Sequence, residues 1–183
     1  MKKLFTLIIT LLSLTANAQK MAVNTDLLMD LAMSPNIGVE ITTGNKTTLG
    51  LNILGNSKPW GQDMKLIEAL PEFRYYFSGR PMYSFFVGLG ASVGFYDYTR
   101  KGKVYDGMHY GGGLTFGYVH KLGKRLNLDA HAGFGIIGYK RKEYYVGDNY
   151  DADYTTDGEL RTNATGYYLM PTRFGVSLTY ILW

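Results

Sequence analysis

The sequence predicts an all-β fold, an antiparallel up-and-down transmembrane β-barrel with eight strands. Three observations lead to this prediction. The chain of 183 residues starts with a segment typical of exported proteins, it contains 23 Gly together with 16 Tyr and 9 Phe, and several of its segments alternate apolar with small or polar residues. Glycine in such numbers would weaken helices, whereas it permits the tight curvature of a small barrel.

The N-terminal segment has the three parts of an export signal. Lys2 and Lys3 carry its only charges, an apolar run extends from Leu4 to Leu14, and Ala16-Asn17-Ala18 forms a small-x-small cleavage site. This order is typical of a cleaved signal peptide. The apolar run is shorter than the roughly 20 residues that a membrane-spanning helix needs. We therefore expect a signal peptide at residues 1–18 and one barrel domain at residues 19–183.

Eight segments of the mature chain show the period of two that indicates β-strands. The clearest covers residues 84–95, where large apolar side chains occupy one face and mainly Gly and Ser the other. Two further segments repeat this pattern, at residues 110–118 and 126–136. Weaker copies complete the set, at residues 23–31, 37–41, 49–53, 73–77 and 174–182.

The connections between these segments alternate in length, as they do in membrane barrels with short periplasmic turns and long external loops. Short connections are expected at residues 44–45, 78–81 and 122–124, and long ones at 55–64, 98–108 and 140–165, while the first external connection, at 33–35, is brief. Pro71 would remove a ladder hydrogen bond, so regular pairing of its strand is expected to start after it. A short helix at residues 64–70 is the alternative for the preceding segment.

The second face of the strands distinguishes a membrane barrel from a soluble, lipocalin-like barrel. It consists mainly of Gly, Ser, Thr and Asn, which fits a crowded interior better than a water-facing wall rich in Lys and Glu. The few charges on this face are expected to pair with one another, because an unpaired buried charge is costly. They are Asp26, Glu40, Glu72, Arg74, Asp129 and Arg173. Since eight strands leave room for little besides their own side chains, we expect an ion-pair network and no open pore.

The C-terminal segment, residues 173–183, resembles the assembly signal of outer-membrane barrels. Its expected determinants are Gly175, Leu178, Tyr180 and the aromatic Trp183. Other tyrosines near strand ends are expected in the aromatic girdles at the membrane interfaces. These are Tyr75, Tyr96, Tyr98, Tyr110, Tyr118, Tyr139 and Tyr180.

The residues offer little for catalysis or cofactor binding. The chain has no cysteine, and its net charge of +4 carries no basic patch that would indicate a nucleic-acid partner. His109, His120 and His131 are scattered, and no serine-histidine-acid group can be assembled from them. A structural role beside Asp129 is expected for His131. The remaining candidate is a calcium site, formed by Asp148, Asp151 and Asp153, although solvated acidic residues are the simpler interpretation. We expect no catalytic residue, cofactor or metal.

Four segments in order along the chain, residues 34–40, 70–77, 122–130 and 171–173, resemble a family of Bacteroides-type bacteria called domain of unknown function 3575. The resemblance covers nearly the whole mature chain. It implies an outer-membrane barrel without an established activity. Some relatives look as though they accompany fimbrial or surface-protein genes, which is a hint towards surface assembly.

These observations predict a non-enzymatic outer-membrane barrel with a structural or surface-interaction role. Its expected partners are outer-membrane lipid, the barrel assembly machinery and surface or fimbrial proteins. Two alternatives remain open. One is a barrel enzyme that acts on outer-membrane lipids, such as a deacylase, and the other is a soluble periplasmic barrel that binds a ligand.

Overall fold

The structure, a computed structural model, describes residues 20–150 and 162–182. Within these ranges the chain forms β1 (Met21–Asp26), α2 (Leu27–Leu31), β2 (Asn36–Thr42), β3 (Thr47–Ser57), the 3-10 segment η1 (Pro59–Gly61), β4 (Met64–Tyr76), β5 (Ser84–Arg100), β6 (Lys103–Lys121), β7 (Leu126–Tyr145) and β8 (Ala164–Ile181). The expected signal peptide at residues 1–18 and Trp183 lie outside the described residues. Neither helical segment of this part of the chain has the length and apolar character to cross a membrane.

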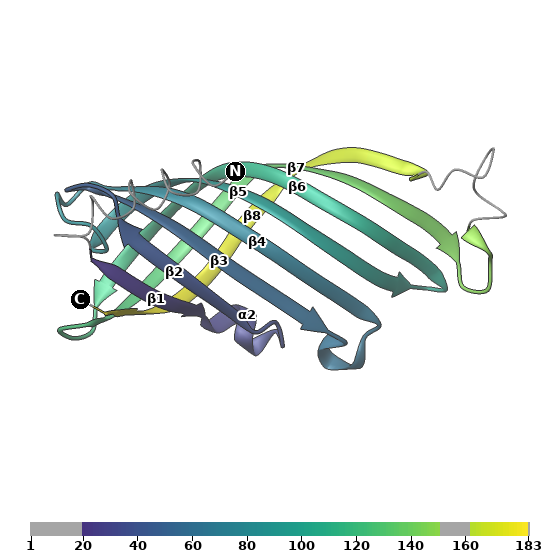
Figure 1. Ribbon diagram of the computed structural model, residues 1–183, viewed down its shortest axis with the longest axis horizontal. Helices are drawn as coiled ribbons and strands as arrows, with labels where there is room; N and C mark the ends of the chain where they lie inside the picture. The colour runs from purple at the N-terminus through teal and green to yellow at the C-terminus, as the bar shows by residue number, and fades with distance from the viewer. Residues whose placement is uncertain (1–19, 151–161, 183) are drawn as a thin grey trace, which may run out of the picture.

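The strands form one antiparallel sheet that closes into a ring. Each strand pairs with its neighbours in sequence, and β8 pairs with β1. Figure 1 shows the strands side by side at an oblique angle, with β5, β6 and β7 reaching well beyond β1 and β2 at one end. We call this the far end, and the opposite end, with the short connections at residues 44–45, 78–81 and 122–124, the turn end. The predicted all-β, eight-stranded antiparallel sheet is confirmed.

The two faces of the ring differ as the alternation predicts. On β5, the side chain of Leu89 is 64% exposed on the outer face, whereas Phe86 is 2% exposed and faces inward. Apolar side chains are exposed on the outer face around the ring, among them Leu51, Phe73, Leu89, Leu114, Phe134 and Phe174. The interior holds small residues and nearly all of the buried charged ones.

The prediction of a strand over residues 23–31 is wrong beyond Asp26. Residues Leu27–Leu31 form α2, and Asp26 is its N-cap, because its Oδ1 atom accepts hydrogen bonds from the backbone N–H groups of Leu28 at 2.9 Å and Met29 at 3.1 Å. A carboxylate at this position satisfies donors that the first helical turn leaves free. β1 therefore has only 6 residues.

Pro71 does not delay its strand, as the sequence prediction had it, and no helix forms at residues 64–70. β4 begins at Met64 and passes through Pro71. On one side Pro71 lies opposite Leu51 of β3. On the other side the ladder with β5 is interrupted between the pair Ala69 with Val93 and the pair Glu72 with Gly90. Pro71 has no backbone N–H group to donate. Because the ladder between β4 and β5 is interrupted at this point, the proline does not break a continuous series of hydrogen bonds.

The long connections expected at the far end are mostly strand. β5 and β6 are joined by Lys101 and Gly102 alone, and both have positive φ, as a tight two-residue hairpin turn requires. β7 continues to Tyr145 and β8 starts at Ala164. The outer face turns polar here, for example at Asp97 and Lys140, so the hydrophobic alternation ends although backbone pairing continues.

Candidate functional site

The inward-facing charges meet at Arg74, which lies on β4 and is 7% exposed. Its Nη1 atom donates to Asp129 Oδ2 on β7 at 2.6 Å, and its Nε atom donates to Glu72 Oε2 at 2.7 Å. Glu40 Oε2 on β2 lies 3.4 Å from Nη1. One guanidinium group thus ties three strands together across the interior.

Two further contacts extend this network. Arg173 of β8 pairs with Glu72 through Nη1 and Oε2. Glu40 Oε1 accepts hydrogen bonds from Thr48 Oγ1 at 2.5 Å and from the hydroxyl group of Tyr76 at 2.8 Å. The structure therefore brings together five of the six charged residues that were expected to pair in the interior, all except Asp26.

Glycine provides the space that these side chains occupy. A Cβ atom on Gly88 would lie 2.5 Å from Glu72 Oε1, closer than real Cβ atoms approach. A Cβ atom on Gly175 would collide with the carboxylate of Asp26. Gly175, which was predicted to belong to an assembly signal, is needed for the fit of β8 against Asp26.

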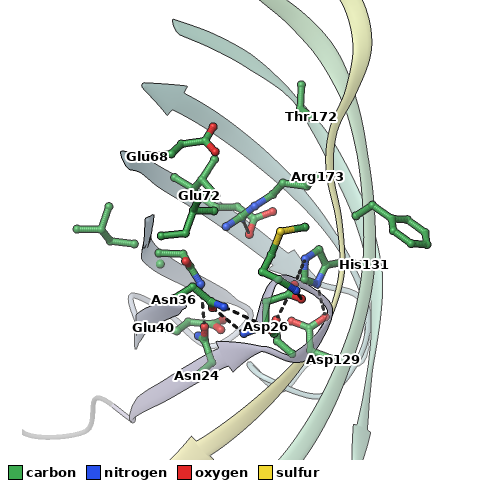
Figure 2. Close-up of a pocket in the computed structure, with 18 of the residues that line it drawn as sticks. Asn24, Asp26, Asn36, Glu40, Glu68, Glu72, Asp129, His131, Thr172 and Arg173 are labelled. Carbon is green, nitrogen blue, oxygen red and sulfur yellow. Dashed lines mark hydrogen bonds and ion pairs between the residues drawn. The ribbon is translucent and has the colours of Figure 1, made fainter. Parts of the chain in front are cut away.

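Asp26 and His131 connect this network to the place where β8 closes the sheet against β1. The Nε2 atom of His131 lies 3.5 Å from Asp26 Oδ2, and its Nδ1 atom lies 3.4 Å from Asp129 Oδ1 (Figure 2). Ser177 Oγ donates to Asp26 Oδ2 at 3.5 Å. Since β1 carries Asp26, β7 His131 and β8 Ser177, these contacts lie where the sheet closes.

A cavity of about 310 Å³ remains beside the network, so the interior is not completely filled. Figure 2 shows that the labelled polar residues around it come from several strands of the ring. Five carboxylates line the cavity together with two arginines and His131. They are Asp26, Glu40, Glu68, Glu72, Asp129, Arg74 and Arg173. The lining also includes apolar residues, among them Met29 of α2, Leu54 of β3 and Leu70 of β4.

Glu68 is a charged cavity residue that the sequence prediction missed. Regular pairing was expected to start after Pro71, which left Glu68 outside any strand. In the structure it lies on the inner face of β4, and its Oε1 atom is 2.9 Å from His109 Nε2. The signal was present in the sequence, because Glu68, Leu70, Glu72 and Arg74 share one face of an uninterrupted strand.

A second group of interior side chains lies at the far end. Tyr96, Tyr98 and Tyr139 were expected in interfacial girdles, and this prediction is wrong for them, because they face inward. Tyr96 stacks on His109 and Tyr98 on Tyr105. The guanidinium group of Arg141 lies 4.3 Å from the ring centroid of Tyr139. The other four tyrosines, Tyr75, Tyr110, Tyr118 and Tyr180, are exposed on the outer face.

Within residues 20–150 and 162–182, the histidines do not form the parts of a serine hydrolase. His131 lies between two carboxylates, and Ser177 donates to Asp26 instead of to the histidine ring. His109 pairs with Glu68, while His120 is exposed near the end of β6.

The remaining expected site residues are only partly within the described chain. Asp148 Oδ2 accepts a hydrogen bond from the Tyr145 backbone, whereas Asp151 and Asp153 lie outside the described residues. No cluster of three or more His, Cys, Asp or Glu side chains that could hold a metal ion occurs in residues 20–150 and 162–182. Leu178 and Tyr180 lie on β8, where Leu178 pairs with Thr25 of β1.

The chain matches one family model over residues 4–182, nearly its whole length, and that family is described as "Protein of unknown function (DUF3575)". Neither the curated proteins nor the solved structures contain a match to this chain.

Proposed function

The chain belongs to the family of proteins of unknown function DUF3575, and we propose that it is a non-enzymatic outer-membrane β-barrel protein with a structural or surface-interaction role. The observation that carries this proposal is the apolar outer face of a closed sheet. On β5 the outward side chains remain apolar from Phe85 to Phe95 and turn polar at Asp97. A tilted strand of this length covers about 25 Å of height, which is the thickness of the apolar band of bacterial membrane barrels.

A lipid environment explains this surface better than water does. Exposed side chains such as Leu89 at 64%, Phe116 at 60% and Phe174 at 67% belong to different strands, so the apolar surface is not a local patch. Soluble monomers rarely expose apolar areas of this extent. The surface therefore argues against the alternative of a soluble, lipocalin-like barrel in the periplasm.

The interior supports a rigid wall and not a wide channel. Arg74 is bound to carboxylates from β2, β4 and β7, and Glu72 also pairs with Arg173 of β8. Because the contacts of Arg74 with Glu40 and Asp129 and of Glu72 with Arg173 join strands that are not neighbours in the ring, the network holds these strands in register and occupies part of the lumen. The interior network therefore supports the proposed structural role of the barrel wall.

The far end supplies a surface for partners. There β5 to β8 continue beyond the apolar part of the outer face, which we call the apolar belt, and expose charged and aromatic side chains such as Arg100 and Tyr145. Aromatic residues and arginine are enriched at the centres of protein interfaces. We therefore propose that this end faces the exterior, and that surface or fimbrial proteins are the partner class to test first.

Export and assembly belong to the same proposal. Residues 1–18 would be removed as a signal peptide during export. Gly175, Leu178, Tyr180 and Trp183 would then present the C-terminal strand to the barrel assembly machinery. The alternative of a lipid-modifying barrel enzyme receives less support, because His131 lies between two carboxylates and not beside a nucleophile.

The proposal is tested by membrane fractionation of cells that express the full chain. We expect the protein in the outer-membrane fraction, shortened by its signal peptide, and migrating differently on gels before and after boiling. Recovery as a soluble periplasmic protein without detergent would overturn the membrane assignment. Altered acyl chains after incubation of the purified protein with lipopolysaccharide would overturn the non-enzymatic role.

A further inference from the structure

The sheet closes over only part of the length of β8. β1 pairs with β8 from Ser177 to Ile181, whereas β7 pairs with β8 from Ala164 to Tyr180. Between Ala164 and Val176, β8 therefore has no strand partner on its β1 side among the described residues. The chain leaves the sheet at Asp26 and forms α2 there. The boundary between α2 and β8 is a break in the backbone ladder, which we call the seam.

The interior cavity reaches the seam from inside. Met29 of α2 and Pro171, Thr172 and Arg173 of β8 line the cavity from the two sides of the break. Two other apolar residues, Leu54 and Leu70, also line it and are 7% and 8% exposed. The cavity thus has an apolar part next to its charged part, and it borders the place where the wall lacks continuous hydrogen bonding.

The outer surface around the seam is apolar as well. Leu31 at the end of α2 is 71% exposed, Met33 is 53% exposed, and Phe174 of β8 is 67% exposed. Trp60, whose backbone N–H donates to the sulfur of Met33, is 71% exposed. Large apolar side chains on both sides of the seam suit an alkyl chain that passes between bilayer and interior.

The charged part of the cavity has an excess of carboxylates. Five acidic side chains line it against the two guanidinium groups of Arg74 and Arg173. Even if His109, which pairs with Glu68, and His131 are both counted as cations, one carboxylate remains in excess. Asp129 is 2% exposed, and the neighbour of its Oδ1 atom is His131 Nδ1 at 3.4 Å, a contact without hydrogen-bond geometry. A buried carboxylate oxygen in this state is stabilised by a cation that donates a hydrogen bond.

We propose that the cavity binds a single-chain amphiphile with a protonated amine head group, which enters through the seam. The amine lies among the carboxylates, and the alkyl chain extends past Met29 and Leu54 towards the apolar rim. This inference goes beyond the proposed function, because it gives the interior a ligand and not only a supporting role.

Calorimetric titration of the full chain, folded in a neutral maltoside detergent, tests the ligand class. The probes are decylamine, decanoate and butylamine, so that head-group charge and alkyl chain are varied separately. We expect saturable binding of decylamine, no saturable binding of decanoate, and binding of butylamine that is weaker by about tenfold or more. Equal binding of decanoate would overturn the charge assignment, and equal binding of butylamine would replace the amphiphile by a soluble amine.

A matched pair of variants on β3 assigns the binding to the cavity. Gly50 lines the cavity, and a Cβ atom there would approach no atom closer than 3.7 Å, so Gly50→Leu fills space without a backbone clash at Cβ. Gly55 lies on the outer face of the same strand, where the nearest atom to a Cβ would be 3.4 Å away. We expect Gly50→Leu to abolish saturable decylamine binding and Gly55→Leu to retain it. Retention by a folded Gly50→Leu protein would overturn the proposal.

Discussion

Arg74 and Asp129 are 55 positions apart in the sequence, and the Nη1 atom of Arg74 donates to Oδ2 of Asp129 at 2.6 Å across the interior of the sheet. This contact joins β4 to β7, which are not neighbours in the ring. Both side chains are less than one tenth exposed. The pair is therefore a direct link between opposite walls, and its removal leaves a buried charge without its partner.

Removal of Arg74 should destabilise the fold strongly. Arg74→Ala leaves the carboxylates of Asp129, Glu72 and Glu40 without their shared cation, and the expected loss is about 3 to 5 kcal/mol of unfolding free energy. Urea unfolding in lipid vesicles measures it. Arg100→Ala, at the exposed end of β5, is the control and should change stability by no more than about 0.5 kcal/mol.

The partner in this effect is identified by a double-mutant cycle with Asp129→Asn. A coupling free energy well above about 0.5 kcal/mol is expected for contacting residues. Additive effects of the two substitutions would contradict the assignment of Asp129 as the principal partner of Arg74.

A charge on the outer face should be costly if that face meets lipid. Leu89 is 64% exposed near the middle of the apolar belt on β5, and Leu89→Arg should cost about 2 to 4 kcal/mol in a bilayer. Its neighbour Gly90 faces inward, and a Cβ atom there would lie 3.7 Å from the nearest atom, so Gly90→Ala should have little effect. Unchanged stability of Leu89→Arg in vesicles would count against lipid contact.

The sequence predicts which face of the sheet a residue occupies better than where a strand ends. Apolar residues alternate with small ones over residues 84–95, so the inward position of Gly90 followed from the period of two. Beyond Phe95 the outer face becomes polar, and hydrophobicity no longer reports the pairing that continues to Arg100. The opposite error occurs after β1, where the apolar pattern continues over residues 27–31 but the strand does not. These residues form a helix, because Asp26 caps it.

The charged interior was predictable as a set but not as a list of contacts. The alternation places Glu72, Arg74 and Asp129 on the inner face. Their pairing depends on the height of each residue in the ring, which the register between neighbouring strands determines. The seam was not predictable, since it results from the early end of β1, and the cavity beside it was not predictable either.

Close contact between β6 and β7 should make one glycine pair intolerant of any side chain. A Cβ atom on Gly135 would collide with the carbonyl oxygen of Gly112, and one on Gly113 would lie 2.5 Å from that of Phe134. Backbone atoms cannot move aside as a side chain can. Gly135→Ala should therefore cost about 1 to 3 kcal/mol, as overpacking in a core does. Equal urea midpoints for Gly135→Ala and Gly90→Ala would contradict this explanation.

Acid should weaken an ion pair at the far end. Glu143 lies beyond the apolar belt, and the hydrogen bond from Lys103 Nζ at 2.6 Å, with a further one from Arg141, lowers the pKa of its carboxyl group. A carboxylate with a lowered pKa adds stability above its ordinary pKa and loses that contribution as the pH falls through the lowered value. The unfolding free energy of the wild type should exceed that of the Glu143→Gln variant by about 0.5 kcal/mol at neutral pH.

This difference should disappear in acid, because the protonated glutamic acid then resembles the amide. Urea unfolding of both proteins at neutral pH and at about pH 2, chosen to lie below the lowered pKa and not only below the ordinary one, provides the measurement. A difference that persists at the lower pH would show that the substitution acts by packing and not by charge.

Deletion of the last strand should prevent both closure and insertion. All pairs between β8 and β1 lie within residues 177–181 of β8, so removal of residues 174–183 leaves β1 and β7 with unpaired backbone groups. In hydrocarbon each such group costs several kcal/mol, and a partly closed sheet should not remain in a bilayer. We expect the truncated chain to be exported but to collect in the periplasm or to be degraded.

The control is removal of residues 151–161, because the pairs between β7 and β8 use residues 126–141 and 164–180. That variant should still insert. Cell fractionation and protease digestion of whole cells compare the two, and insertion of the chain without residues 174–183 would contradict the coupling of closure to insertion.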